Sequence, residues 1–163
     1  MPMRTLWFSA NLIIAREKES GVDKDIVVTQ KDIIELVKAK AAIHAATTIL
    51  LDHLKLEEEN IDKILLAGAF GSYIDPENAR TLGMLPDLDL ERILPIGNAT
   101  GSGAKLALLN IGKRYEAEEL SAKAVFLELA THPMFVREYI DSMHLPYKSL
   151  DRYPRTVNLL KRL

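Results

Sequence analysis

The most informative absence in this sequence is cysteine, because its 163 residues contain none. Without thiols the chain cannot form disulfides, use a thiolate nucleophile, or hold cysteine-ligated zinc or an iron–sulfur cluster. Long apolar runs are also missing, since none approaches the roughly 18 residues of a membrane span. The amino-terminal stretch lacks the apolar core and the cleavage site of a signal peptide. We therefore expect a cytoplasmic protein without a membrane partner.

A strong charge imbalance is missing as well, with 21 basic and 23 acidic residues and a net charge of -2. Because no basic tract stands out, we expect no nucleic-acid partner. The four histidines have no metal-ligand spacing. Asp87 and Asp89 resemble a calcium loop that lacks its glycine and closing glutamate, so we expect a solvated loop there and no metal site.

Strand-like and helix-like segments alternate along the chain, which is typical of an α/β fold. The first 28 residues predict a hairpin from "TLWFSANLIIA" and "DIVV". Thr29 and Asp32 have capping-box spacing at the start of an alanine-rich helix from about Gln30 to His53. Its alanine-rich middle predicts close approach to another backbone or to a sheet. We expect its apolar stripe to comprise Ile33, Val37, Ile43, Leu50 and Leu54.

The remaining elements are predicted from shorter patterns. In chain order they are a strand in "ILLAG", a helix in "DPENARTLGMLP", a strand in "RILPIGN", helices in "GSGAKLALLNIG" and "EAEELSAKA", a strand in "VFLEL", and a helix in "HPMFVREYIDSM". Phe126, in the last of these strands, is expected in the core. The end of the chain is polar and basic, so we expect one domain over residues 1–145 and a frayed tail over residues 146–163.

The stretch "LLAGAFG" carries a possible ligand site. Gly68 and Gly71 follow a short buried strand, and ligands of open α/β sheets lie beyond the carboxyl ends of the strands. Glycine there permits a positive φ and lets a ligand lie against the backbone. A tight turn at the end of the strand explains the same residues equally well, so both interpretations remain open.

Two other groups of residues were weighed as candidate sites. Gly97, Gly101 and Gly103 surround a predicted helix start, but they match neither a dinucleotide fingerprint nor a P-loop, so a small-faced, closely packed helix is favoured. On the long helix Glu35 and Lys38 share a face, whereas Lys40 lies on another side. Charges of this kind are most often simply solvated.

Three stretches resemble a known family. "VTQKDIIELVKAKAAIHAATTILL", "IDKILLAGAFGSYIDPENARTLGMLPDL" and "ILPIGNATGSGAKLALLN" are similar to the carboxy-terminal ATPase-like domain of reductive activators of corrinoid proteins. That domain belongs to the acetate and sugar kinase, Hsp70 and actin superfamily. The resemblance implies an α/β, ribonuclease H-like half-domain, with a mixed sheet, an antiparallel edge hairpin and flanking helices.

The resemblance also implies roles for particular residues. The glycine loop would be the nucleoside platform, formed by Gly68, Ala69, Phe70 and Gly71. Glu35 and Lys40, with Lys38 as a rival, would lie near the ribose and base. The helix after Gly97 would be the superfamily's second connecting helix.

The chain departs from the family in two ways. It has neither the phosphate and magnesium loop of the first half nor the cysteines of the iron–sulfur domain. We therefore expect an incomplete ATPase domain that offers the adenosine-side wall of a cleft, with ATP and magnesium bound only alongside a missing first half or partner subunit, and no catalytic residue of its own. The alternative is a non-enzymatic interaction module that forms a homodimer or docks a corrinoid protein.

Overall fold

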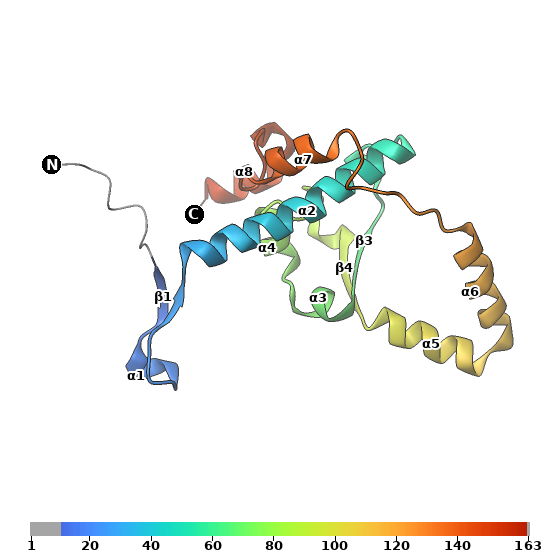
Figure 1. Ribbon diagram of the computed structural model, residues 1–163, viewed down its shortest axis with the longest axis horizontal. Coiled ribbons are helices and arrows are strands. Elements are labelled where there is room, and N and C mark those ends of the chain that lie inside the picture. Colours follow the sequence, from blue (N-terminus) through green and yellow to red (C-terminus); the bar gives the residue numbers. More distant parts are fainter. Residues whose placement is uncertain (1–10, 163) are drawn as a thin grey trace.

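The chain is arranged around one long helix, α2 (Gln30–Leu54), which crosses the whole body of the molecule (Figure 1). The computed structural model describes residues 11–162. The predicted capping box is confirmed: Thr29 Oγ1 accepts the backbone N–H of Asp32, and the Asp32 carboxylate accepts that of Thr29. These two reciprocal hydrogen bonds satisfy two of the four backbone N–H groups that have no partner within the helix at its start.

A two-stranded parallel sheet lies beside this helix. It pairs β3 (Ile64–Ala67) with β4 (Ile93–Gly97), so both predicted strands are confirmed. The connection between them contains α3 (Gly68–Tyr73), α4 (Pro76–Thr81) and the 3-10 turn η2 (Leu90–Arg92). Asp75 caps α4 through the backbone N–H of Asn78, and Pro76 follows at the first helical position, as the sequence predicts.

The apolar core lies between α2, α4 and this sheet. Its buried side chains and the half-buried side chains packed on them are Ala79, Met84, Leu85 and Ile93, then Ile43, Ile64, Leu66 and Ile74. The expected stripe on α2 is largely wrong, since Leu50 and Leu54 are exposed. The buried face of α2 comprises Lys40, Ala41, His44, Ala45 and Ile49. Small side chains at 41 and 45 let α7 (Phe135–Ser142) pack closely against α2, which confirms the close approach expected of the alanines.

The amino-terminal hairpin is confirmed for the described residues. It pairs β1 (Leu12–Ala15) antiparallel with β2 (Ile26–Val28), and the short helix α1 (Glu17–Ser20) lies between them. Residues 5–10 of the predicted first strand lie outside the described residues. The α/β class is confirmed, but the hairpin forms a sheet of its own instead of an edge of the β3–β4 sheet.

An arm of two helices extends away from the body after β4 (Figure 1). It consists of α5 (Ala99–Leu109) and α6 (Ile111–Lys123), and neither helix has a buried residue. The helix predicted in "GSGAKLALLNIG" ends at Leu109, and Gly112 lies inside the next helix, α6. Close packing of Gly103 is not seen within the described residues, because a Cβ there would meet no atom within 4 Å.

The segment "VFLEL" forms no strand, contrary to the prediction. Residues 124–130 have no regular secondary structure and lead from α6 to α7. Phe126 is 83% exposed, so its expected place in the core is wrong. The pattern favours a strand, but no neighbouring strand lies beside it among residues 11–162.

The expectation of a frayed carboxyl terminus is wrong. The chain after α7 forms the 3-10 turn η3 (Leu150–Arg152) and α8 (Pro154–Leu160). Tyr153 and Thr156 are fully buried and Tyr147 nearly so, because they pack against α2 and the loop after α4. We call residues 144–160 the carboxyl strap. The sequence did not predict this packing because the buried residues of the strap are tyrosine and threonine, which form only a weak periodic pattern.

Within residues 11–162, no helix is long and apolar enough to cross a membrane.

Candidate functional site: the glycine edge of the parallel sheet

The carboxyl ends of β3 and β4 form an edge marked by two glycines. Gly68 follows β3 with φ +78°, and Gly97 ends β4 with φ +64°. The pairing register places Gly97 opposite Ala67, so the two glycines lie at the same edge. A Cβ built on either would meet no atom within 4 Å, so each backbone faces open space. This is the position at which parallel sheets bind ligands, and we call it the glycine edge.

The other residues of the predicted platform have different environments. Residues 68 to 73 are helical, so the expected glycine loop is a short helix, α3, directly after the strand. Gly71 is buried, and a Cβ there would lie 2.3 Å from the carbonyl oxygen of Leu66. Gly71 is therefore required for the turn from strand to helix, whereas Gly68 leaves the open space. Ala69 is exposed, and the side chain of Phe70 lies outside the described part of the chain.

The predicted residues of α2 are divided between its surface and its core. Glu35 and Lys38 form an exposed ion pair, with Lys38 Nζ 2.9 Å from Glu35 Oε1, and this carboxylate raises the pKa of Lys38. Lys40 is fully buried, and its ammonium donates to the carbonyl oxygen of Pro146 in the carboxyl strap. Burial lowers the pKa of Lys40 to about 8. Lys40 thus holds the strap, whereas Lys38 lies on the surface, where it pairs with Glu35.

A buried polar cluster missed by the sequence lies beside Lys40. One turn along α2, His44 Nδ1 lies 2.9 Å from Ser142 Oγ, and both side chains are buried. The His44 ring stacks on Tyr147 at 5.0 Å between ring centroids. Burial, with smaller effects from Arg152 and Lys40, lowers the pKa of His44 to about 3. The signal that could have revealed this cluster is the i, i+4 spacing of Lys40 and His44 beside Ala41 and Ala45.

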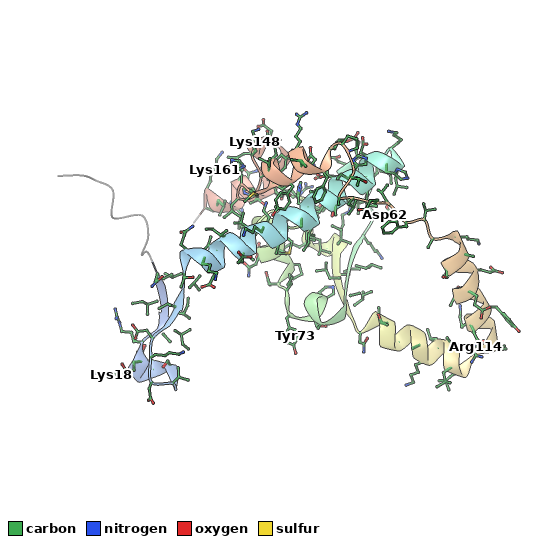
Figure 2. The ribbon with its side chains drawn as sticks, in the orientation of Figure 1. Lys18, Asp62, Tyr73, Arg114, Lys148 and Lys161 are labelled. Atoms are coloured by element: carbon green, nitrogen blue, oxygen red, sulfur yellow. The ribbon has the colours of Figure 1, made fainter. Side chains whose placement is uncertain are left out.

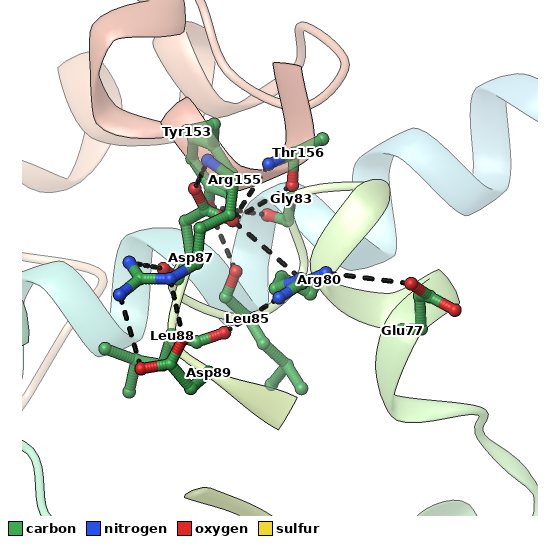
Figure 3. Close-up of polar contacts among 10 residues, drawn as sticks. All are labelled: Glu77, Arg80, Gly83, Leu85, Asp87, Leu88, Asp89, Tyr153, Arg155 and Thr156. Atoms are coloured by element: carbon green, nitrogen blue, oxygen red, sulfur yellow. Dashed lines mark hydrogen bonds and ion pairs between the residues drawn. The ribbon is translucent and has the colours of Figure 1, made fainter. Parts of the chain in front are cut away.

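Asp87 is the centre of a second polar cluster, shown in Figure 3. It is only 4% exposed, which corrects the expectation of a solvated loop. Its carboxylate accepts the backbone N–H groups of Arg155 and Thr156, and also the Thr156 hydroxyl at 3.1 Å. Arg80 Nε lies 3.8 Å from the same carboxylate. Since Tyr153, the N-cap residue of α8, makes no side-chain cap, Asp87 caps that helix from another part of the chain.

Neither cluster forms an open reaction site. Within residues 11–162, no group of three or more histidine, aspartate or glutamate side chains is placed to hold a metal ion. A hollow of about 740 Å³ lies between the end of α2, the turn η1 (Glu58–Asn60) and the start of α8, and none of the predicted nucleotide residues lines it. Its charged side chains include Glu58 and Arg152, which already pair with each other. The glycine edge therefore remains the candidate site.

Comparison with known proteins decides the family. A family model described as the C-terminal domain of RACo, the ASKHA domain, matches residues 8–157. The chain belongs to this family. The resemblance noted in the sequence is thereby confirmed, together with the actin-like α/β fold class.

Individual relatives of this RACo-type domain have related names. The chain is 36% identical over 129 residues to the "Corrinoid activation enzyme RamQ" of Eubacterium limosum, covering 79% of this chain and 21% of the relative. It is 32% identical over 117 residues to a "[Co(II) methylated amine-specific corrinoid protein] reductase" of Methanosarcina barkeri, covering 71% and 22%. A solved "Reductive activator for corrinoid,iron-sulfur protein" superposes with a TM-score of 0.81 at 36% identity, covering 89% and 23%. The chain thus spans less than a quarter of the length of each of these proteins.

Proposed function

We propose that this chain forms the adenosine-side wall of an ATP cleft in a reductive activator of corrinoid proteins, acting in the cytoplasm. The observation that carries the proposal is the pair of open, positive-φ glycines at adjacent strand ends, Gly68 and Gly97. Positive φ without a side chain lets a flat nucleoside lie directly on backbone. The names of the relatives support the corrinoid role.

The geometry of α2 favours Lys38 over Lys40 as the basic residue beside the nucleoside. Glu35 and Lys38 lie side by side on the surface, where a carboxylate and an ammonium can meet ribose hydroxyls and base nitrogens. Lys40 is fully buried and its ammonium already has an acceptor. The resemblance implied Lys40 for the nucleoside contact, with Lys38 as its rival. We assign this contact to Lys38 and a structural role to Lys40.

The phosphate and magnesium groups are expected from the remaining polypeptide. In-line phosphoryl transfer needs a metal ion and positive charge around the γ-phosphate. The sequence has no D-x-G-T-type loop, and no residue at the glycine edge takes that role. We therefore expect this chain alone to bind nucleotide weakly and not to hydrolyse it. An iron–sulfur cluster needs cysteines from elsewhere in the activator.

The test is an ATP titration followed by calorimetry, with and without magnesium, on the wild type and on Gly68→Asn. Asparagine tolerates positive φ but places a side chain in the open space, so ATP binding should be lost. The matched control is Gly21→Asn, since Gly21 has φ +68° and equally open surroundings in the hairpin. Gly71→Val is unsuitable, because it would collide with the backbone of Leu66.

Two results would contradict the proposal. If the wild type takes up no ATP at millimolar concentration, the chain alone has no nucleotide role. If Gly68→Asn binds ATP as the wild type does, the glycine is needed only for the turn.

The Lys38→Met variant should bind ATP more weakly than the wild type. The control Lys113→Met breaks a similar i, i+3 ion pair on α6 and should leave ATP binding unchanged.

The arm favours a second candidate function, the docking of a corrinoid protein. None of its helical residues is buried, and Leu108 and Leu109 are exposed by 75% and 73%. Exposed apolar surface of this kind marks protein contacts. A purified methylated-amine-specific corrinoid protein should bind the immobilised chain, and Leu108→Asp should weaken binding while Val22→Asp should not. Absence of binding would reject this function.

A further inference from the structure

His44 is enclosed by aromatic rings of the carboxyl strap. Its side chain is buried, and its ring stacks on Tyr147 at 5.0 Å and lies 6.0 Å from Tyr153, measured between ring centroids. The buried Ser142 hydroxyl lies 2.9 Å from its Nδ1. A hydroxyl can donate to the unprotonated nitrogen of a neutral imidazole. These surroundings therefore suit the neutral ring.

The charged groups around His44 oppose a further positive charge. Burial has the largest effect on the pKa of His44, and the Arg152 and Lys40 charges lower this pKa further. Two carboxylates of the same region, Glu58 and Glu138, both pair with Arg152. A protonated His44 in this position would therefore be buried beside two cations, without an ion pair of its own among the described residues.

The first part of the strap covers both basic side chains of this α2 face. We call residues 144–149 the first turn of the strap. Its Pro146 carbonyl accepts the Lys40 ammonium, and its Tyr147 ring lies against His44. Both basic groups thus face neutral groups of the first turn. Burying a charge against neutral groups is costly, so this contact is sensitive to protonation.

The other anchors of the strap pair opposite charges. The Asp87 carboxylate, which holds the start of α8, lies beside Arg80. Lys148 Nζ lies 2.8 Å from Asp141 Oδ1 of α7, and the hydrogen bond from Lys148 keeps the pKa of Asp141 below its usual value of 3.8. Asp141 therefore stays ionised between pH 7 and pH 5. The contact with His44 is the one that a proton in this range weakens.

We propose that the first turn of the strap is a pH-sensitive switch, which opens when His44 takes up a proton while α8 stays docked. In the closed state the turn covers a neutral imidazole. In the open state the ring lies in water and can carry a charge. Opening presents His44 and Lys40, one helical turn apart on α2, as two exposed cations. The switch depends on contacts within residues 11–162 and not on nucleotide.

The size of the effect follows from the two states of His44. Its pKa is about 3 when the turn is closed and near 6.5 when the ring is in water. Below pH 6.5 the open state binds one more proton than the closed state, so a falling pH favours opening. The opening equilibrium constant should rise roughly 25-fold from pH 7 to pH 5. Lys40, with a pKa of about 8, stays charged across this range and changes it little.

The test follows two backbone amides of the wild type by NMR hydrogen exchange. Lys148 N–H reports the first turn, because it donates to the Asp141 carbonyl oxygen. Val157 N–H reports α8, because it donates to the Tyr153 carbonyl oxygen. After correction for intrinsic exchange rates, the protection of Lys148 should fall roughly 25-fold from pH 7 to pH 5.

Low concentrations of urea separate opening of the turn from unfolding of the whole chain. Local opening exposes little surface, so the Lys148 protection should respond weakly to urea. At each pH it should also be lower than that of Val157. Val157 should instead exchange through a larger unfolding step that urea promotes strongly.

Two histidine variants identify the group that takes up the proton. His44→Gln should remove the fall in Lys148 protection between pH 7 and pH 5, because glutamine does not titrate. The matched control is His144→Gln, since His144 is exposed and belongs to the first turn itself. This control should retain the fall.

Three results would overturn the proposal. The first is equal Lys148 protection at pH 7 and pH 5 in the wild type, which needs no variant. The second is equal protection of Lys148 and Val157 with the same response to urea, because the strap and the body then unfold as one unit. The third is a fall that His44→Gln retains or that His144→Gln loses, because another group then takes up the proton.

Discussion

At the scale of the residue, identical amino acids have opposite roles according to their surroundings. Gly68 leaves space at the glycine edge, whereas Gly71 is needed because the Leu66 carbonyl occupies the position of a Cβ. Lys38 is exposed, and Lys40, two residues later, is buried on the other side of the same helix. The site therefore depends on which face of each element is covered.

His44 gives a prediction at this scale. Its pKa is about 3 in the folded chain and about 6.5 when unfolded, chiefly because burial disfavours the charged ring. Between these values the unfolded state binds one more proton, so stability falls as the pH drops below 6.5. The free energy of unfolding should decrease by about 1.4 kcal/mol per pH unit from this group.

Urea unfolding at pH 7, 6 and 5 measures this slope. His44→Gln should remove most of it, while His53→Gln, an exposed histidine near the end of the same helix, should retain it. An equal slope in the wild type and in His44→Gln would show that other groups cause the pH dependence.

At the scale of the element, helix α8 depends on a distant residue for its start. It has seven residues and no side-chain cap of its own. Asp87 provides the cap from the loop between α4 and β4, and Arg80 holds that carboxylate from α4 (Figure 3). The buried Asp87 carboxylate, which accepts three hydrogen bonds, thus joins α8 to the loop between α4 and β4.

Asp87→Asn should destabilise the chain by about 2–4 kcal/mol, because it leaves donors of α8 and the Arg80 charge without a buried carboxylate. The control is Asp89→Asn, where the carboxylate meets Arg155 but is 60% exposed, and the loss should stay below about 1 kcal/mol. Chemical unfolding monitored by circular dichroism compares the two. Equal losses would mean that burial of Asp87 contributes nothing.

At the scale of the whole molecule, the carboxyl strap closes one side of α2. It reaches α2 through Lys40 and Pro146, and the loop after α4 through Tyr153, whose hydroxyl donates to the Leu85 carbonyl at 3.1 Å. Its outer surface carries charged side chains, among them Lys148 on the strap and Lys161 directly after it (Figure 2). The strap thus buries one face of the central helix.

Truncation after Met143 should therefore remove cooperative unfolding, because Lys40 and His44 would become exposed on an apolar face. Truncation after Leu160 removes only the last three residues and should leave the thermal transition near that of the wild type. Thermal denaturation followed by circular dichroism distinguishes the two. A cooperative transition in the shorter variant would restore the expectation of a dispensable tail.

Some of the fold was predictable because its signals are local. The capping box at Thr29, the Asp75–Pro76 helix start and the two parallel strands each arise from a few neighbouring residues. The open position of Gly68 after a strand was raised as a ligand site from the sequence, whereas Gly97 was assigned to a closely packed helix start. The family could be identified from the same stretches.

Which residues are buried depends on contacts that local patterns do not predict. Local patterns predicted the long helix α2, the strands β3 and β4 and the start of α4, together with the absence of thiol chemistry and the family. They also predicted a strand at residues 125–129 that is not formed, and they missed α8. A short-range contact with Leu66 decided that Gly68 rather than Gly71 leaves space. Packing between distant segments decided that Lys40 holds the strap and that Asp87 caps α8, and it gave "VFLEL" no neighbouring strand among residues 11–162. These outcomes depend on contacts between residues up to 106 positions apart, which no local pattern encodes.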